Sequence, residues 1–296
     1  MNNPFESFLT YLFKERNYSE HTLGAYRRDL MQFNLFLKDN FEIGVVEVEK
    51  KQIRHWLIHL YEKGFVEVTI NRKLATLKSY YNFLVIIEER SSNPARLVKS
   101  LKTPSRLPIN YNQKEMDRVL APSLFSDDFS GIRDYGVLLL FYTTGLRRAE
   151  LIGLELKDVD LGRAELKVLG KGMKERVLPM IPEMVQILYK YLSLRKEAFP
   201  CSCQSLFLTN KGNKLYPKFV YNLVKHYLSV GVIGKVKSPH KLRHSFATHL
   251  LDSGAEINSI KTMLGHSSLS ATQIYTNHSA EKLKRIYKSY HPRGEK

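Results

Sequence analysis

Six side chains of this 296-residue sequence have the types that cleavage of a phosphodiester requires. They are two arginines, two histidines, a lysine and a tyrosine, namely Arg147, Lys171, His240, Arg243, His266 and Tyr275. A phosphodiester under attack passes through a pentacoordinate state whose nonbridging oxygens carry excess negative charge, and fixed positive groups stabilise that state. The set can therefore cut a DNA phosphodiester without a metal ion, and we expect neither a metal site nor a cofactor.

The arginines and the tyrosine have the most direct expected roles. A guanidinium meets phosphate oxygens bidentately and stays charged at any working pH, so Arg147 and Arg243 are expected to hold the phosphate. Tyr275 is expected to be the nucleophile, because a phenolate can form a covalent phosphoenzyme that keeps the energy of the broken bond. The reaction would then require no ATP.

The proton transfers are assigned to the lysine and the two histidines. Lys171 stands between two glycines that let the backbone approach DNA, and it is suited to donate a proton to the departing 5′ oxygen. Of His240 and His266, one would take or share the phenol proton and the other would donate a hydrogen bond to the phosphate; the sequence does not fix which. Lys167 and Lys174 lie nearby, so the choice of lysine is also left open.

Four segments around these residues resemble the tyrosine recombinases, specifically the bacterial Xer type, and the likeness covers nearly the whole chain. The segments are 144–151, 170–176, 239–244 and 264–275. The family's Arg, Lys, His-x-x-Arg, His and Tyr match, in that order, the six residues named above. The family also carries an acid three residues after its first arginine, which matches Glu150 and could orient Arg147 at helical spacing. Met173, in the lysine hairpin, and Arg148, beside the matched arginine, depart from the usual pattern.

The resemblance implies a site-specific DNA recombinase. Such an enzyme cuts and rejoins strands through a 3′-phosphotyrosine link and a Holliday junction, with four protomers on two duplex sites. The implied partners are a double-stranded DNA recombination site and a homo- or hetero-tetramer with a related recombinase, and a DNA translocase is left open as a further partner. Chromosome or plasmid dimer resolution is favoured over mobile-element integration, because the chain is compact and shows no added N-terminal arm-binding domain.

Two rival functions use the same residues or the same charge. A type IB topoisomerase would nick and reseal one duplex through the same covalent step. A DNA-binding regulator would keep the arginines and lose the chemistry, but no residue of the matched set is missing. Each short motif is weak alone, and only their joint occurrence in one order favours the recombinase.

Composition favours a polyanion as partner. Lys and Arg number 46 against 29 Asp and Glu, a formal net charge of +17, and residues 104–296 hold 30 of those basic residues and 17 of the acidic ones. No signal peptide and no apolar run of membrane-spanning length is recognisable, so we expect a cytoplasmic protein without membrane contact. The two cysteines, Cys201 and Cys203, are expected to be free thiols.

The apolar periodicity predicts a mainly α fold with a small antiparallel β-sheet in the C-terminal domain. In residues 1–95, Leu9, Leu12 and Phe13 indicate one helix, Ser19 is expected to cap a second, and further helices are predicted around 53–60 and 68–87. The resemblance identifies this part as a SAM-like core-binding domain. Residues 96–110 have the composition of a basic linker, and a hinge there would let two domains close around a duplex. The resemblance implies that they do so as a C-shaped clamp.

Residues 111–296 are expected to form the catalytic domain. Strands are predicted at 165–169 and 175–179, with Lys171 at the hairpin tip, and helices at 183–198, 218–228 and 240–251. A terminal amphipathic helix is predicted at 280–290. The resemblance implies that it docks on a neighbouring subunit, and capping of its own domain is the alternative.

Basic side chains outside the catalytic set are candidate DNA contacts. Those on the predicted helix 68–87 and in the linker are expected to meet phosphates. They are Arg72, Lys73, Lys78, Lys99, Lys102 and Arg106. The alternative for the helix is a solvated basic face without a partner.

Overall fold

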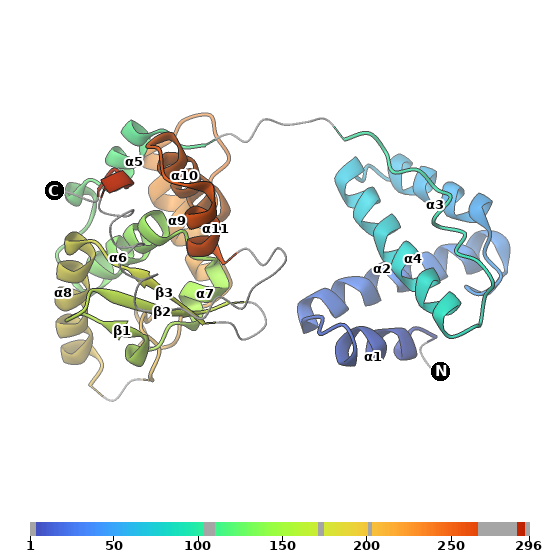
Figure 1. Ribbon diagram of the computed structural model, residues 1–296, viewed down its shortest axis with the longest axis horizontal. Coiled ribbons are helices and arrows are strands. Elements are labelled where there is room, and N and C mark those ends of the chain that lie inside the picture. Colours follow the sequence, from blue (N-terminus) through green and yellow to red (C-terminus); the bar gives the residue numbers. More distant parts are fainter. Residues whose placement is uncertain (1–3, 104–109, 171–174, 201–202, 266–288, 294–296) are drawn as a thin grey trace. The chain divides into compact units, whose positions relative to one another are not determined.

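The computed structural model describes residues 4–103, 110–170, 175–200, 203–265 and 289–293 (Figure 1). The chain forms two compact units, Met1–Leu107 and Pro108–Lys296. The first unit is helical, and the second combines helices with a three-stranded antiparallel sheet. The predicted mainly α fold with a small sheet in the second domain is confirmed.

Four helices build the described part of the first unit. They are α1 (Glu6–Lys14), α2 (Glu20–Phe41), α3 (Lys50–Glu62) and α4 (Glu67–Ile86). The Ser19 hydroxyl accepts a hydrogen bond from the Thr22 amide and caps α2 as predicted. The core is aromatic at its centre, where Phe33 and Trp56 are fully buried with ring centroids 4.8 Å apart. The helix indicated by Leu9, Leu12 and Phe13 is confirmed as α1, in which Leu9 and Leu12 are buried and Phe13 is 53% exposed.

The chain that follows α4 stays attached to the first unit for several residues. The Asn71 side chain on α4 donates to the Leu101 carbonyl (2.9 Å) and accepts from the Leu101 amide (2.8 Å). Val98 is buried in the same core. Residues 96–101, which the sequence placed in the linker, therefore pack against the first unit, and the boundary between the units lies at Leu107–Pro108.

The second unit is built around α6 (Phe129–Thr144), which is buried on nearly every side. Helices α8 (Pro182–Ala198) and α10 (Pro239–Asp252) pack against it, and α5 (Gln113–Val119) packs against α9 (Pro217–Gly231). Short helix α7 (Arg148–Gly153) follows α6, and α11 (Ile257–Leu264) follows α10. Two single 3-10 turns, Pro122–Leu124 and Leu156–Asp158, complete the helical elements of the described residues.

The sheet packs against the second unit's core through Leu166, Val168 and Leu178. Strands β1 (Val159–Asp160), β2 (Glu165–Leu169) and β3 (Glu175–Pro179) pair in that order, and β2 and β3 have the bounds predicted from the sequence. Register is fixed by pairs such as Val168 with Arg176. Residue Lys171 lies between β2 and β3 but falls outside the described residues, so its expected place at the hairpin tip stays a prediction.

The last described residues pack on their own unit. His291 is 5% exposed and its ring lies against those of Tyr142 and Phe246, with centroids 5.3 and 5.9 Å away. Arg293 donates to both carboxylate oxygens of Glu183 at 3.0 and 3.1 Å. Most of the terminal helix predicted at 280–290 lies outside the described residues. Its docking on a neighbour stays a hypothesis, while the segment just after it holds to its own domain.

The cysteines, the possible metal ligands and the apolarity of the helices bear on other expected features. Cys203 is free and exposed, and Cys201 lies outside the described residues. Within the described ranges, no three His, Cys, Asp or Glu side chains group closely enough to bind a metal ion. In that same part of the chain, every helix is too short or too polar to cross a membrane.

Candidate active site

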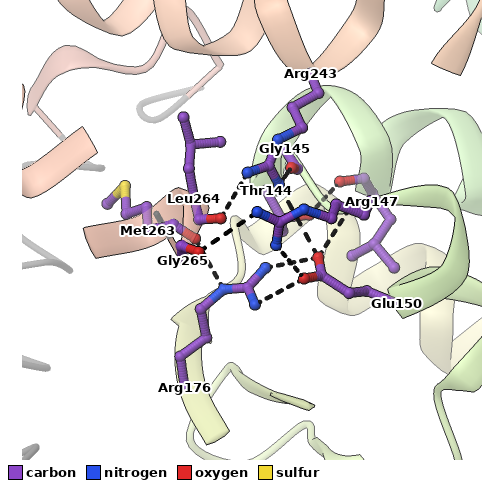
Figure 2. A network of polar contacts seen from close by, with 10 residues as sticks. Thr144, Gly145, Arg147, Glu150, Arg176, Arg243, Met263, Leu264 and Gly265 are labelled. Atoms are coloured by element: carbon purple, nitrogen blue, oxygen red, sulfur yellow. Dashed lines mark hydrogen bonds and ion pairs between the residues drawn. The ribbon is translucent and has the colours of Figure 1, made fainter. Parts of the chain in front are cut away.

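Three arginines from separate elements converge on one buried carboxylate (Figure 2). Arg147 precedes α7, Arg176 lies in β3, Arg243 lies in α10, and all three guanidinium groups surround Glu150 of α7. We call these four residues the arginine cluster. Two of the three arginines and the glutamate were expected in the site; Arg176 was not.

The turn between α6 and α7 sets the position of Arg147. Gly145 ends α6 with a left-handed backbone (φ 62°), and a Cβ there would lie 2.5 Å from a ring carbon of Phe246 and 2.8 Å from a side-chain carbon of Leu264. Arg147 is the N-cap residue of α7, and its backbone amide donates to Glu150 Oε2 at 2.8 Å. A glycine that lets three helices meet thus places the first catalytic candidate at a helix start.

The Arg147 side chain is both oriented and accessible. Its Nη1 donates to Glu150 Oε1 at 2.8 Å, and Nη2 lies 3.4 Å from the Gly265 carbonyl oxygen. Among the described residues, these contacts use two of the five N–H groups of the guanidinium. The side chain is 34% exposed, so its remaining donors can reach a phosphate that approaches from solvent.

Arg243 is held more tightly. Its Nη1 donates to the Gly145 carbonyl at 2.6 Å and its Nη2 to the Leu264 carbonyl at 2.5 Å, while Nη1 also lies 4.0 Å from Glu150 Oε2. Gly145 is the C-cap of α6 and Leu264 is the last residue of α11, so the guanidinium joins the C-terminal ends of two helices. Arg243, the predicted phosphate ligand, therefore also holds the ends of α6 and α11 together.

Electrostatics leave the arginine cluster with excess positive charge. Burial would raise the pKa of Glu150, but hydrogen bonds from Arg176 and Arg147 outweigh it and hold the pKa below its ordinary value. Burial and the neighbouring charge of Arg147 lower the pKa of Arg243 to about 10. The charge of Glu150 raises this pKa but does not offset the lowering. Three guanidiniums thus face one carboxylate. An added anion would relieve their mutual repulsion, which suits a site where phosphate charge increases during reaction.

The other candidates are placed less completely. His240 lies in the first turn of α10, one helical turn before Arg243, and it is exposed. Lys171, His266 and Tyr275 lie outside the described residues. Gly265, the residue before His266, is the C-cap of α11 and lies beside Arg147 and Arg176. The glycine of the Gly-His motif therefore contacts the arginine cluster.

Comparison with known proteins identifies the family. The phage integrase family profile matches residues 112–282, and the N-terminal SAM-like domain of phage integrases matches residues 5–86. The chain belongs to the phage integrase family. Its arginine cluster lies within the region that defines that family.

Relatives of the Xer type match this chain over almost its whole length. Tyrosine recombinase XerC of Chlorobaculum parvum is 37% identical over 314 residues, covering 97% of this chain and 94% of the relative. Tyrosine recombinase XerD of Staphylococcus epidermidis is 34% identical over 300 residues, covering 99% of this chain and the whole relative. The chain is thus a tyrosine recombinase of the Xer type, as the sequence motifs indicated.

Solved structures show the same fold. XerH recombinase bound to palindromic difH substrate, in a post-cleavage complex, superposes with a TM-score of 0.72 at 22% identity and covers 94% of this chain and 83% of that one. The Tn1549 transposon integrase with transposon right-end DNA gives 0.69 at 22% identity, covering 94% and 98%. At this identity the likeness concerns the fold.

Arg176, the third arginine of the cluster, was not predicted from the sequence. Arg176 is 4% exposed and donates from Nη1 and Nη2 to the two oxygens of Glu150, at 3.1 and 2.8 Å. Its Nε donates to the Met263 carbonyl at 2.9 Å. A signal existed: in β3, Arg176 occupies an inward position between outward-facing neighbours, and a charged residue there needs a buried partner.

The candidate DNA contacts of the first unit differ in exposure. Lys73 is buried, and its ammonium donates to Asp29 Oδ1 at 2.9 Å and to Gln32 Oε1 at 2.6 Å. Arg72 also pairs with Asp29 but leaves 49% of its side chain exposed. The expectation that Lys73 contacts a phosphate is therefore wrong, because its ammonium is buried and paired with Asp29 inside the unit. Lys78 is half-buried, Lys99 and Lys102 are exposed, and Arg106 lies outside the described residues.

Proposed function

We propose that this chain is a site-specific DNA recombinase that cuts and rejoins strands through a covalent 3′-phosphotyrosine intermediate and a Holliday junction. The observation that carries the proposal is the convergence of Arg147 and Arg243, far apart in sequence, on one side of Glu150 with excess positive charge. The full-length similarity to tyrosine recombinases XerC and XerD supports the same activity.

In the proposed reaction, the Tyr275 phenol oxygen attacks the scissile phosphorus. A P–O bond to tyrosine forms while the bond to the 5′ oxygen breaks, and the phenol proton passes to His240 or His266. The departing 5′ oxygen takes a proton from Lys171. Attack by a 5′ hydroxyl of the partner strand reverses these steps, so one phosphodiester replaces another and no external energy source is consumed.

The arginines would bind the nonbridging oxygens throughout. Arg147 supplies donors that are open to solvent, and Arg243 supplies charge from a buried, fixed position. Because both are oriented before DNA binds, little reorganisation is needed when charge accumulates on phosphorus. Glu150 is proposed as the group that orients Arg147.

The first unit is proposed to bind the DNA recombination site through Arg72, Lys78 and the basic residues that follow α4, namely Lys99, Lys102 and Arg106. Arg72 is the best supported, since Asp29 holds its guanidinium while half of the side chain remains exposed. Burial would raise the pKa of Asp29, but hydrogen bonds from Arg72 and Lys73 hold that pKa below its ordinary value. Asp29 therefore stays charged and keeps Arg72 oriented.

Higher assembly is part of the proposal. Four protomers, either of this chain alone or with a related recombinase, would bring two DNA sites together, and the two units of each protomer would close on the duplex. The terminal helix at 280–290 would link neighbours, and a DNA translocase is left open as a further partner. The work is proposed to be chromosome or plasmid dimer resolution in the cytoplasm.

A plasmid test separates the recombinase from the topoisomerase. Supercoiled plasmids carrying two copies of the DNA site selected by this protein from a random-sequence pool should yield resolved circles. A plasmid without the site should stay supercoiled. Relaxation of both plasmids without recombinants would favour the topoisomerase, and site binding without either product would favour the regulator.

A further inference from the structure

Arg176 joins three segments that each carry a residue of the proposed reaction. Its backbone lies in β3, two residues after the hairpin segment that contains Lys171. Its guanidinium binds Glu150, the partner of Arg147, and the carbonyl of Met263, three residues before His266. Figure 2 shows the side chain reaching from the strand toward both α7 and the end of α11.

All three nitrogens of the Arg176 guanidinium take part in these contacts. Nε, Nη1 and Nη2 each donate a hydrogen bond within 3.1 Å, and the side chain is 4% exposed. Gly265 lies directly against it, since a Cβ at that position would stand 3.2 Å from Nη1 of Arg176. A phosphate therefore has no access to this arginine, in contrast to Arg147 with 34% of its side chain exposed.

Glu150 needs Arg176 to orient Arg147. Its carboxylate accepts bonds from the amide and Nη1 of Arg147 and from both terminal nitrogens of Arg176. Arg176 is the only one of the three arginines that is bidentate to Glu150 through its side chain. Without this pair, the buried carboxylate would depend on Arg147 for its hydrogen bonds, which would draw that guanidinium's donors away from a phosphate.

We propose that Arg176 is a positioning residue for strand cleavage. It fixes Glu150, and through it Arg147, and it ties both to the end of α11 through the Met263 carbonyl. It does not touch DNA. The inference rests on the proposed recombinase function, and it assigns Arg176 to the rate of cleavage rather than to the affinity for the site.

The test is single-turnover formation of the covalent protein–DNA adduct by the full chain. The probe is a duplex of the selected site, nicked beside the scissile phosphate so that the cleaved product is trapped. Arg176→Lys keeps the charge but not the planar fork, and we expect the rate at saturating protein to fall roughly 10- to 100-fold. The protein concentration for half-saturation should change by less than about twofold.

Arg195→Lys is the matched control for a folding defect. Arg195 is also buried (7% exposed) in the second unit, and its Nη2 donates to the carbonyls of Cys203 and Ser205, away from the arginine cluster. It should lose stability without slowing adduct formation by more than about threefold at a temperature where both variants are folded. An equal rate loss in the two variants would overturn the assignment of Arg176.

A double-mutant cycle tests whether Arg176 acts through Glu150. Glu150→Gln and Arg176→Lys together should be little slower than the slower single variant, because both changes release the same arginine. Fully multiplied losses, or an Arg176→Lys rate within twofold of the native rate, would contradict the proposal. If the native chain itself forms no adduct while bound to the probe, the proposed function fails instead.

Discussion

Replacing Glu150 with glutamine should destabilise the second unit and leave the first unchanged. The carboxylate accepts four hydrogen bonds at 2.8 to 3.1 Å, two from Arg147 and two from Arg176. A glutamine offers one oxygen, and its amide NH2 would face a guanidinium. The variant therefore loses at least two charge-assisted bonds and leaves Arg176 as a buried cation without a counter-charge.

The size of the effect follows from burial. Glu150 and Arg176 have side chains 5% and 4% exposed, so solvent does not screen their interaction, and removing one partner of such a pair costs about 3 to 5 kcal/mol. Arg147 is partly solvated and adds little to this figure. We expect the free energy of unfolding of the second unit to fall by about 4 kcal/mol.

The chain's single tryptophan allows the two units to be measured separately. Trp56 is fully buried in the first unit, so its fluorescence during urea unfolding reports that unit, while far-UV circular dichroism reports both. Glu150→Gln should move the dichroism transition and not the fluorescence transition. Glu155→Gln, which removes an exposed ion pair with Lys157, is the control and should move neither. Equal shifts in the two glutamine variants would refute the reasoning.

Three further outcomes are expected. Asp29→Asn should leave Lys73 buried without a counter-charge and lower the stability of the first unit by about 3 kcal/mol, seen in tryptophan fluorescence; an unmoved transition would contradict this. Burial lowers the pKa of His291 in the folded protein to about 3, so as the pH is lowered the unfolded chain takes up a proton on this histidine before the folded chain does. The free energy of unfolding therefore decreases as the pH drops below about 6.5. His291→Gln should remove about 2 kcal/mol of the loss between pH 7 and pH 5 measured by urea unfolding, and an identical pH profile would count against it. Arg147→Lys should slow adduct formation roughly 100-fold, whereas Arg148→Lys, an exposed neighbour, should slow it less than about threefold; the reverse order would move the assignment by one residue.

Periodicity predicted the elements that have one buried face. Strand 165–169 alternates between buried and more exposed positions, strand 175–179 does so over its first four residues, and the bounds of both were found from the sequence. Helix α6 was not predicted, because it is buried on nearly every side and shows no amphipathic pattern. Its burial depends on α8 and α10, which lie far along the chain.

The candidate site was partly predictable for a related reason. Arg147, Arg243 and Glu150 stand in recognisable motifs, and the structure brings them together. Arg176 was missed and Lys73 was placed at the surface, because their roles depend on partners 26 and 44 residues away, Glu150 and Asp29. A basic residue is expected at the surface unless its buried counter-charge is known, and only the fold shows that partner.

Trapping and mapping the covalent adduct tests the central claim most directly. The native chain, bound to a nicked duplex of its selected site, should form a covalent complex whose digestion yields one DNA-linked peptide, modified at Tyr275. Tyr275→Phe should bind the same duplex with unchanged affinity and form no adduct. Attachment at another residue, or an undiminished adduct in the phenylalanine variant, would contradict the account.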